Sequence, residues 1–129
     1  MRLIDDANDI AAGTLVLAND DDVLSRADEL RRAATVVLNF PKWTDGRAYS
    51  QAVLLRGRLR YSGQIVACGE VLIDMLPLLR RCGFDAVQLR ADQSLDAAAR
   101  VLETLPQPFA GHYQADAAGG RPSYASQTA

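Results

Sequence analysis

Four short apolar runs, each followed by a stretch with the apolar spacing of a helix, constrain this chain more than any other feature. The runs are residues 14–18, 35–40, 65–68 and 86–89. The stretches with helical spacing are residues 23–34, 48–59, 72–79 and 95–105. Strands that alternate with helices pair in parallel through right-handed crossovers. We therefore expect an α/β fold with a small parallel sheet of about four strands, built from βα units, with helices on both faces.

Individual residues sharpen this expectation. Thr35–Phe40 is the clearest strand, because it is rich in β-branched residues and is stopped by Pro41. Pro77 lacks the hydrogen-bond donor of a helix interior, so we expect a kink or a break there. Gly83 is expected to cap the end of that helix, and Ser94 the start of the last one.

The length of 129 residues suits one domain, which we place over residues 1–110. Residues 111–129 are rich in Ala, Gly, Ser and Gln, and this composition predicts a flexible tail. Phe109 and Tyr113 are the side chains with which the end of the chain would dock on the domain.

Basic and acidic residues nearly balance, at 14 and 16, giving a formal charge of −2. This balance favours neither nucleic acid nor an anionic membrane as a partner. The N-terminus has acidic residues where a signal peptide needs apolar ones, and no window approaches the roughly 18 apolar residues of a membrane span. We expect a cytoplasmic protein in which Cys68 and Cys82 stay reduced.

In a parallel sheet, ligands bind beside the loops that leave the carboxyl ends of the strands. This rule selects residues 19–22, 41–47, 68–70 and 90–92, and it excludes Arg80 and Arg81 at the opposite edge. The candidate ligand-binding residues are Lys42, Asp45, Gly46, Arg47, Ser50, Gly69, Glu70 and Asp74. No residue is assigned a catalytic role.

The loop after the second run has two interpretations. Lys42 and Arg47 supply positive charge and Gly46 permits close approach of the backbone, so the loop suits an anion. Alternatively, Asp45 or Thr44 only caps the following helix, and the two cations are solvated.

Glu70 and Asp74 also have two interpretations. Their spacing of four residues places both carboxylates on one face of a helix, where they would suit acid–base chemistry. The alternative is an acid favoured by the helix dipole, together with an aspartate that faces solvent.

Metal and cofactor signals are weak. His112 is the single histidine, and no paired cysteines accompany it, so a zinc or iron–sulfur site lacks ligands. The acidic run 20–22 is explained better by a helix cap than by a cation. Cys68 and Cys82 fall at opposite ends of a helix, too far apart for a disulfide. The sequence also lacks a glycine-rich phosphate loop and a Gly-x-Ser-x-Gly elbow. We expect no metal and identify no cofactor.

Several blocks of the sequence resemble a bacterial family known as domain of unknown function 934. The longest block is residues 40–52, which contain Asp-Gly-Arg, and residues 80–86 contain Arg-Cys-Gly-Phe-Asp. Further matches lie at 54–56, 61–63, 67–74 and 113–114, so the likeness spans about residues 15 to 114. The chain departs from the family at Leu54, Val66 and Met75, where relatives carry polar residues.

Members of that family tend to be encoded beside sulfite reductase and phosphoadenylyl-sulfate reductase. The resemblance therefore implies a role in assimilatory sulfate or sulfite reduction, in association with an oxidoreductase. The polar residues that the resemblance adds or supports as candidates are Lys42, Asp45, Arg47, Ser50, Asp74, Arg80, Arg81 and Asp85.

Two hypotheses follow. In the first, the chain is an accessory protein of sulfite reduction that binds a small oxyanion, or docks on a reductase, around Lys42 and Arg47. In the second, it is a non-catalytic α/β interaction module with no bound ligand, and the motif residues serve as caps and salt bridges. A free-standing oxidoreductase would need a cofactor that nothing in the sequence visibly binds.

Overall fold

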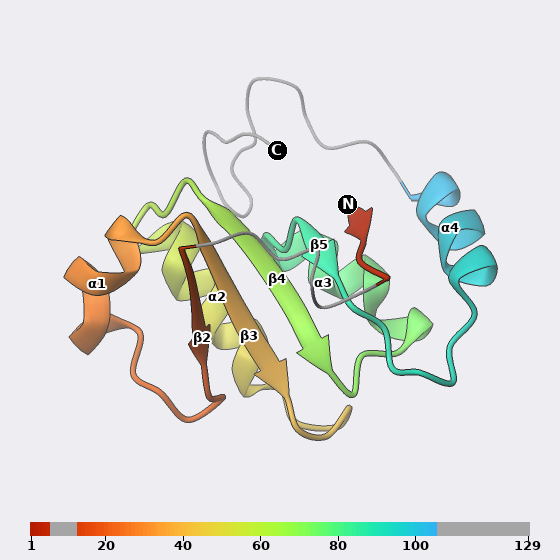
Figure 1. Ribbon diagram of the computed structural model, residues 1–129, viewed down its shortest axis with the longest axis horizontal. Helices are drawn as coiled ribbons and strands as arrows, with labels where there is room; N and C mark the ends of the chain where they lie inside the picture. The colour runs from red at the N-terminus through yellow and green to blue at the C-terminus, as the bar shows by residue number, and fades with distance from the viewer. Residues whose placement is uncertain (6–12, 106–129) are drawn as a thin grey trace.

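The protein is built on a sheet of five parallel strands. In the computed structural model, which describes residues 1–5 and 13–105, the strand order is β1-β5-β4-β3-β2 (Figure 1). The strands are β1 (Arg2–Leu3), β2 (Thr14–Leu17), β3 (Thr35–Phe40), β4 (Gln64–Gly69) and β5 (Ala86–Val87). The expected α/β fold with a small parallel sheet is confirmed. The four predicted strands are all present.

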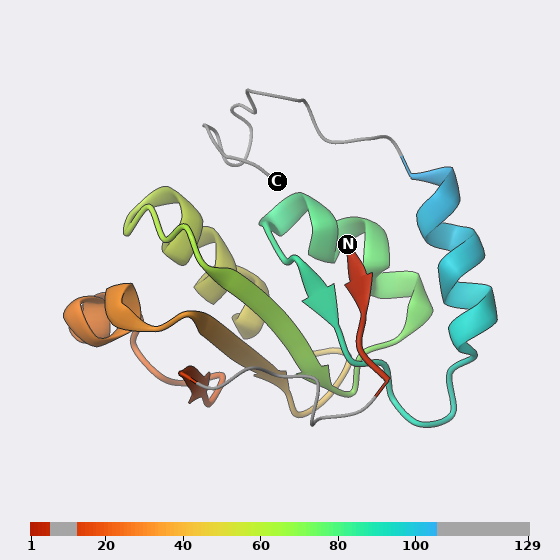
Figure 2. The ribbon, with the colours of Figure 1, turned by 45° about the horizontal axis from the view of Figure 1, so that its top comes forward.

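The strand that the sequence did not reveal is β1. It has only two residues, and it pairs with β5 so that Arg2 lies opposite Ala86 and Leu3 opposite Val87 (Figure 2). The Arg2 amide donates to the Asp85 carbonyl oxygen over 2.8 Å, and the Ile4 amide donates to the Val87 carbonyl oxygen over 2.8 Å. A polar opening of this length has no periodicity to read, so its strand depends on a partner far along the chain.

The helices are α1 (Ala27–Arg32), α2 (Arg47–Gly57), α3 (Leu76–Cys82) and α4 (Leu95–Thr104). Short 3₁₀ turns, η2 (Leu24–Arg26) and η3 (Ile73–Met75), precede α1 and α3. The Ala97 amide donates to Ser94 Oγ over 3.1 Å, so the predicted cap of the last helix is confirmed.

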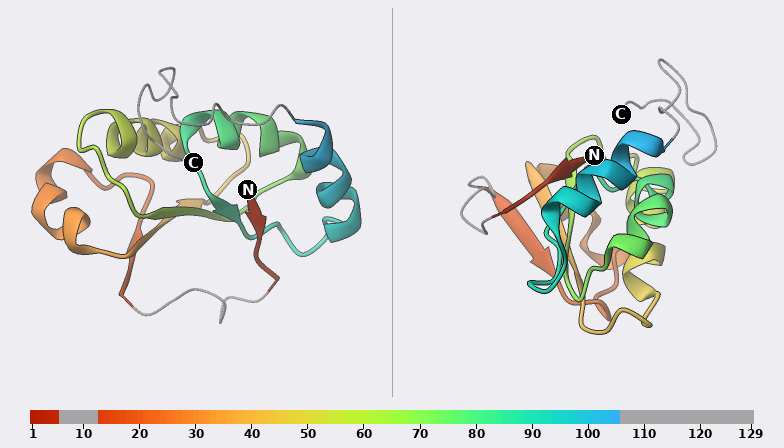
Figure 3. Two further views of the ribbon diagram at one scale, coloured as in Figure 1. Left: turned by 90° about the horizontal axis from the view of Figure 1, so that it is seen from above. Right: turned by 90° about the vertical axis from the view of Figure 1, so that its right-hand side faces the viewer.

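All four helices pack on one face of the sheet, which differs from the expected two-sided arrangement (Figure 3). The main core joins the buried helix residues to one set of alternating strand residues, among them Val36, Leu38 and Ile65. The other face has its own small cluster of Ile4, Val37, Val66 and Ala86, to which no helix contributes. Since β2, β3, β4 and β5 follow one another across the sheet in one direction, right-handed crossovers place every helix on the same side.

Pro77 marks the beginning of a helix instead of a kink within one. It lies in the first turn of α3, where its missing amide hydrogen has no helical acceptor to lose. The break expected at this proline is the junction between η3 and α3. At the other end of α3, Gly83 has a φ of 105° and caps the helix as predicted.

The predicted tail, residues 111–129, and the docking of Phe109 and Tyr113 lie outside the described residues, as does His112.

Arg56 of α2 connects more segments than any other side chain at the edge where the strands begin. Its side chain is 16% exposed, and all five of its N–H donors have acceptors. Two reach the Gly83 carbonyl oxygen at 2.9 and 3.1 Å, and two reach the carbonyl oxygens of Tyr61 and Gly63 at 2.8 Å. The fifth reaches Asp85 Oδ2 at 2.5 Å. Arg56 thus joins α2 to the segments that precede β4 and β5.

Its neighbours are held in turn. Asp85 Oδ2 also accepts from the Ile65 amide over 2.9 Å. Tyr61 lies beside the Arg56 guanidinium, 5.8 Å from ring centroid to Cζ, and donates its buried hydroxyl to the Ala33 carbonyl oxygen over 2.8 Å. Burial raises the pKa of Tyr61 to about 12, so this hydroxyl stays a donor at any ordinary pH.

Replacing Arg56 by lysine should lower the free energy of unfolding by about 2 to 3 kcal/mol, because an ammonium group cannot supply a planar fork of donors to four acceptors. Urea unfolding followed by circular dichroism measures the change. The matched control is Arg58→Lys, at an exposed arginine two residues away, which should change the stability by less than about 0.5 kcal/mol. Equal stability of Arg56→Lys and the parent protein would contradict this view of Arg56.

Candidate functional site

The four loops that the sequence selected do meet at one edge of the sheet, the carboxyl edge (lower edge of Figure 1). Hydrogen bonds connect them in spatial order. Asn19 Nδ2 donates to Asp45 Oδ2 over 2.6 Å, which joins the loops after β2 and β3. The Trp43 amide donates to Glu70 Oε1 over 3.3 Å, which joins the loops after β3 and β4. The Arg90 amide donates to the Val71 carbonyl oxygen over 2.9 Å and adds the loop after β5.

Asp45 is occupied by its own neighbours. Its Oδ1 accepts from the Arg47 amide over 3.0 Å and lies 3.4 Å from Arg47 Nε, while its Oδ2 accepts from Asn19. The side chain of Asp45 is 19% exposed, whereas that of Arg47 is 66% exposed. The geometry agrees with the capping interpretation, since Asp45 satisfies the first amide of α2.

Glu70 is likewise engaged. Its Oε1 accepts from the Trp43 amide and lies 3.9 Å from Arg90 Nη1. Arg90 is bound more closely by Asp92, with Nε–Oδ1 and Nη2–Oδ2 distances of 2.7 and 2.8 Å. These hydrogen bonds from Arg90 lower the pKa of Asp92 to about 2. Arg90 is therefore held between two carboxylates at the end of the sheet, and the three groups keep a net charge of −1.

Glu70 and Asp74 do not share a helix. The backbone between them is extended at Leu72, and Asp74 lies in the short turn η3. The spacing argument for a carboxylate pair on one helix face therefore does not apply here. Asp74 is exposed to solvent.

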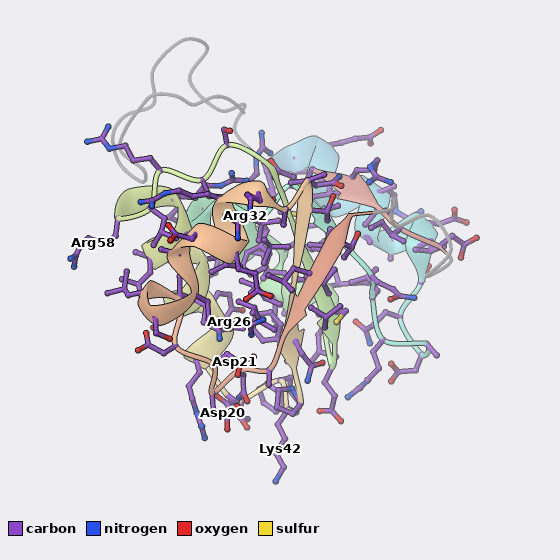
Figure 4. All side chains as sticks on the ribbon, turned by 60° about the vertical axis from the view of Figure 1, so that its left-hand side comes forward. Asp20, Asp21, Arg26, Arg32, Lys42 and Arg58 are labelled. Carbon is purple, nitrogen blue, oxygen red and sulfur yellow. The ribbon has the colours of Figure 1, made fainter. Side chains whose placement is uncertain are left out.

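The remaining candidates are spread over the surface. Lys42 is exposed, and Figure 4 shows its side chain pointing away from the body at the same end of the molecule as Asp20 and Asp21. Arg47 and Ser50 line an open depression beside the acidic residues 20–22. Lys42 and Arg47 therefore do not converge on a common pocket.

Gln51 is a residue of this edge that the sequence reasoning missed. It is 4% exposed, and its Nε2 donates to the carbonyl oxygens of Ala18 and Asp21 over 2.9 and 3.0 Å. It attaches α2 to the loop after β2. The available signal was a polar residue in the otherwise apolar stripe of Ala48, Ala52 and Leu55.

Gly69 is required by the backbone. Its φ is 95°, and a Cβ atom there would lie 2.4 Å from the Phe40 carbonyl oxygen. Gly46 has no such restriction, because its φ is −90° and the nearest atom to an added Cβ is Tyr49 Cδ2 at 4.0 Å. Gly69 thus lets the end of β4 approach β3 closely, and this requirement explains the glycine without a ligand.

Both cysteines are free thiols, as expected from the sequence. Burial raises the pKa of the Cys68 thiol and that of the Cys82 thiol. The Cys68 thiol lies 3.8 Å from Asn39 Oδ1 on the neighbouring strand. Raised pKa values leave little thiolate at neutral pH, so neither group has the character of a nucleophile.

Residues 1–5 and 13–105 contain neither a cluster of metal ligands nor a helix that could span a membrane. In that part of the chain, no three acids, cysteines or histidines gather closely enough to hold a metal ion. None of the helices there is long and apolar enough to cross a bilayer.

Three of the sequence blocks that carry the family resemblance meet at the opposite edge of the sheet. Residues 54–56, 61–63 and 80–86 are separate in the chain, yet each supplies a member of the group around Arg56. Asp85 and Gly83 of the Arg-Cys-Gly-Phe-Asp block are its acceptors. These blocks therefore have a structural explanation, and Asp85 binds Arg56 instead of a ligand.

The fold and this arrangement define a small parallel α/β domain whose loops are fastened to one another by paired side chains. A family model described as bacterial protein of unknown function, DUF934, matches residues 14–124, and the chain belongs to this family. No curated protein and no solved structure was found to match the chain.

Replacing Gly69 by alanine should lower the free energy of unfolding by more than about 2 kcal/mol, because the new Cβ meets backbone and the left-handed φ disfavours a side chain. Gly46→Ala is the matched control in the same site, with an expected change of less than about 0.5 kcal/mol. Thermal and urea unfolding distinguish the two. Equal losses would mean that the junction of β3 and β4 is not tightly restricted.

At pH 8, the two thiols of the folded protein should react with iodoacetamide at least about tenfold more slowly than those of the protein unfolded in urea. The reason is that burial raises the pKa of both thiols and keeps them protonated. A raised pKa in the folded state also fixes the sign of the pH dependence. The stabilising contribution is complete below the ordinary thiol value of 9.0 and is lost as the pH rises through the higher folded-state values. Rapid labelling of either cysteine in the folded protein would contradict this.

Proposed function

We propose that this protein is a cytoplasmic accessory protein of assimilatory sulfate or sulfite reduction that docks on a reductase and performs no turnover of its own. The chain belongs to the DUF934 family, and the pathway is the one that the resemblance to this family implies. The pairing of charged side chains at the carboxyl edge supports docking on a partner over catalysis.

The observation that carries the proposal is that most of the charged loop residues of the carboxyl edge, Lys42 excepted, are bound to neighbouring groups of that edge. Asp45 is bound by Asn19 and Arg47, and Glu70 is bound by the Trp43 amide and faces Arg90. A site for a small oxyanion needs cations that are free and aimed at one point. This edge instead presents a surface whose groups are already held in place.

The charges around the depression at the start of α2 also disfavour an oxyanion. Arg47 and Ser50 would face it, but Asp20, Asp21 and Asp22 form its other wall. A sulfite or sulfate ion there would lie beside three acidic residues, of which only Asp21 has an arginine partner, Arg26. A protein partner is less restricted, because it can bring groups of either sign to the positions where they fit.

The thiols support the same conclusion. Sulfur chemistry by a protein group would use a reactive thiolate, and burial of Cys68 and Cys82 raises the pKa of both. The alternative is an α/β interaction module that binds neither an oxyanion nor a reductase. It differs from our proposal in its partner, so an experiment with the reductase separates the two.

The test is isothermal titration of the purified chain with sulfite, sulfate, adenylylated sulfate and, separately, a sulfite reductase of the kind encoded beside the family. We expect measurable heat with the reductase and none with the three small anions. Gel filtration of the mixture should show the two proteins eluting together, and heating the chain before mixing provides the unfolded control.

Heat with any small anion that disappears in Arg47→Ala would instead support oxyanion binding at the carboxyl edge. The matched control is Arg100→Ala, at an exposed arginine of α4. Absence of both heat and co-elution with the reductase would contradict the proposed function and favour the alternative module.

A further inference from the structure

The edge where the strands begin carries an unusual density of arginines. Each helix that crosses back to the sheet ends there, so its last turn and the residues that follow it share this edge. We name as the arginine rim the group Arg2, Arg31, Arg32, Arg58, Arg60, Arg80 and Arg81. Figure 4 shows Arg32 and Arg58 at this end of the molecule, with Asp20, Asp21 and Lys42 at the other.

Most of these guanidinium groups form no ion pair with a described residue. Within residues 1–5 and 13–105, only Arg31 among them has a carboxylate within 4.0 Å, where its Nη1 faces Asp28 Oδ1. Of the other acids at that edge, Asp85 is bound by Arg56, Glu29 is bound by Arg26 and attracted more weakly by Arg32, and Glu103 in the last turn of α4 forms no ion pair in the described structure. The rim is therefore a concentration of positive charge on a chain whose formal charge is −2.

Several arginines elsewhere in the described structure do form ion pairs with carboxylates. Arg26 lies 3.1 Å from Asp21 and 3.0 Å from Glu29, and Arg90 lies 2.7 Å from Asp92. Away from the rim the chain thus provides carboxylates for Arg26, Arg47 and Arg90, whereas the exposed Arg100 has none in the described structure. On the rim it does not, although unpaired like charges repel and lower the stability of the fold.

Helix dipoles do not account for the whole rim. A cation in the last turn complements the partial negative charge of a helix end, which explains Arg31, Arg32, Arg80 and Arg81. Arg58 is the C-cap residue of α2, so the dipole also favours its charge. Arg2 lies in a strand and Arg60 lies beyond the end of α2, so the dipole does not explain these two.

Arg60 is the residue that most needs an explanation. It is the one described non-glycine residue with a positive φ, at 55°, a conformation that costs about 1 kcal/mol for a residue with a side chain. Glycine or asparagine would adopt it more easily. Arg60 and Arg31 come from different segments and line the same open depression, together with Ser62. The backbone is thus held in a costly conformation where it presents a second guanidinium to this depression.

We propose that the arginine rim is a docking surface for an acidic surface of a partner protein. Arginine forks match carboxylates in a bidentate manner, and arginine is enriched at protein interfaces whereas lysine is depleted. The rim contains no lysine, since the single lysine of the chain is Lys42 at the opposite edge.

Nucleic acid fits the rim less well. Proteins that hold single strands add exposed aromatic side chains on which bases stack. The aromatic residues of this edge in the described structure, Tyr61 and Phe84, are 5% and 3% exposed, and the exposed Trp43 lies in a loop of the carboxyl edge. The identity of the partner as a reductase rests on the proposed function, whereas the preference of the rim for an acidic protein surface does not.

The test measures binding of a fluorescein-labelled peptide of alternating aspartate and glutamate by fluorescence anisotropy at low salt. The rim variant is Arg58→Gln combined with Arg81→Gln, both exposed. The control is Lys42→Gln combined with Arg100→Gln, which removes the same charge from exposed positions outside the rim. We expect the parent protein and the control to bind alike, the rim variant to bind at least about tenfold more weakly, and added salt to weaken binding.

Melting temperatures separate binding from folding. Arg58 and Arg81 form no ion pair in the described structure, so the loss of repulsion among the rim arginines should offset the loss of their favourable interaction with the helix ends, and the rim variant should melt close to the temperature of the parent. If it melts lower, the single variants Arg58→Gln and Arg81→Gln replace it, and loss of peptide affinity in either folded single variant supports the rim.

Three results would overturn the inference. These are failure of the parent protein to bind the peptide, equal binding by the rim variant and the control, and tighter binding of a labelled DNA duplex than of the peptide. The reductase distinguishes the two proposals. A rim variant that still co-elutes with the reductase removes the rim from docking and leaves the proposed function intact. A parent protein that binds the peptide but not the reductase does the reverse.

Discussion

The Arg56 guanidinium is the interaction on which the arrangement of α2, β4 and β5 depends. Its five donors are distributed over the Tyr61, Gly63 and Gly83 carbonyl oxygens and the Asp85 carboxylate. Each acceptor lies just before a strand or just after a helix, where the backbone leaves regular structure and carbonyl groups lose their regular partners. One side chain therefore satisfies the turns that lead into two strands and fixes their spacing.

The two edges of the sheet use their charges in opposite ways. At the carboxyl edge, where parallel sheets commonly bind ligands, Asp45, Glu70 and Asp92 each have a cation or an amide as a partner. At the amino edge, Arg56 is satisfied but most of the surrounding arginines are not. The arginines without an ion pair in the described structure are thus concentrated on the edge where ligands are not usually expected.

The fold was largely predictable from the sequence, since Thr35–Phe40 and the other apolar runs have clear periods, and Ser94 and Gly83 are local signals of helix ends. β1 was not predictable, because its two residues gain their structure from pairing with Ala86 and Val87. The placement of all helices on one face follows from strand order, which periodicity does not contain.

The candidate site was predictable in place but not in detail. The rule for parallel sheets brought Asn19, Asp45, Glu70 and Arg90 to one edge, and they are there. The sequence alone could not show that these groups bind one another, because the same residue type, aspartate or glutamate, can cap a helix or bind a substrate. The role of Arg56 was hidden for a similar reason, since its acceptors are main-chain oxygens that no motif displays.

The pairing of β1 with β5 has a consequence for how the protein is made. Residues 1–5 leave the ribosome long before β5, and Arg2 and Leu3 can pair only after Ala86 and Val87 have emerged. Ile4 packs with Val37 and Val66 on the face opposite the described helices, and it can do so only once β1 has paired. Apolar residues of that face therefore stay exposed to water until β5 has been synthesised, and this exposure favours contact between nascent chains.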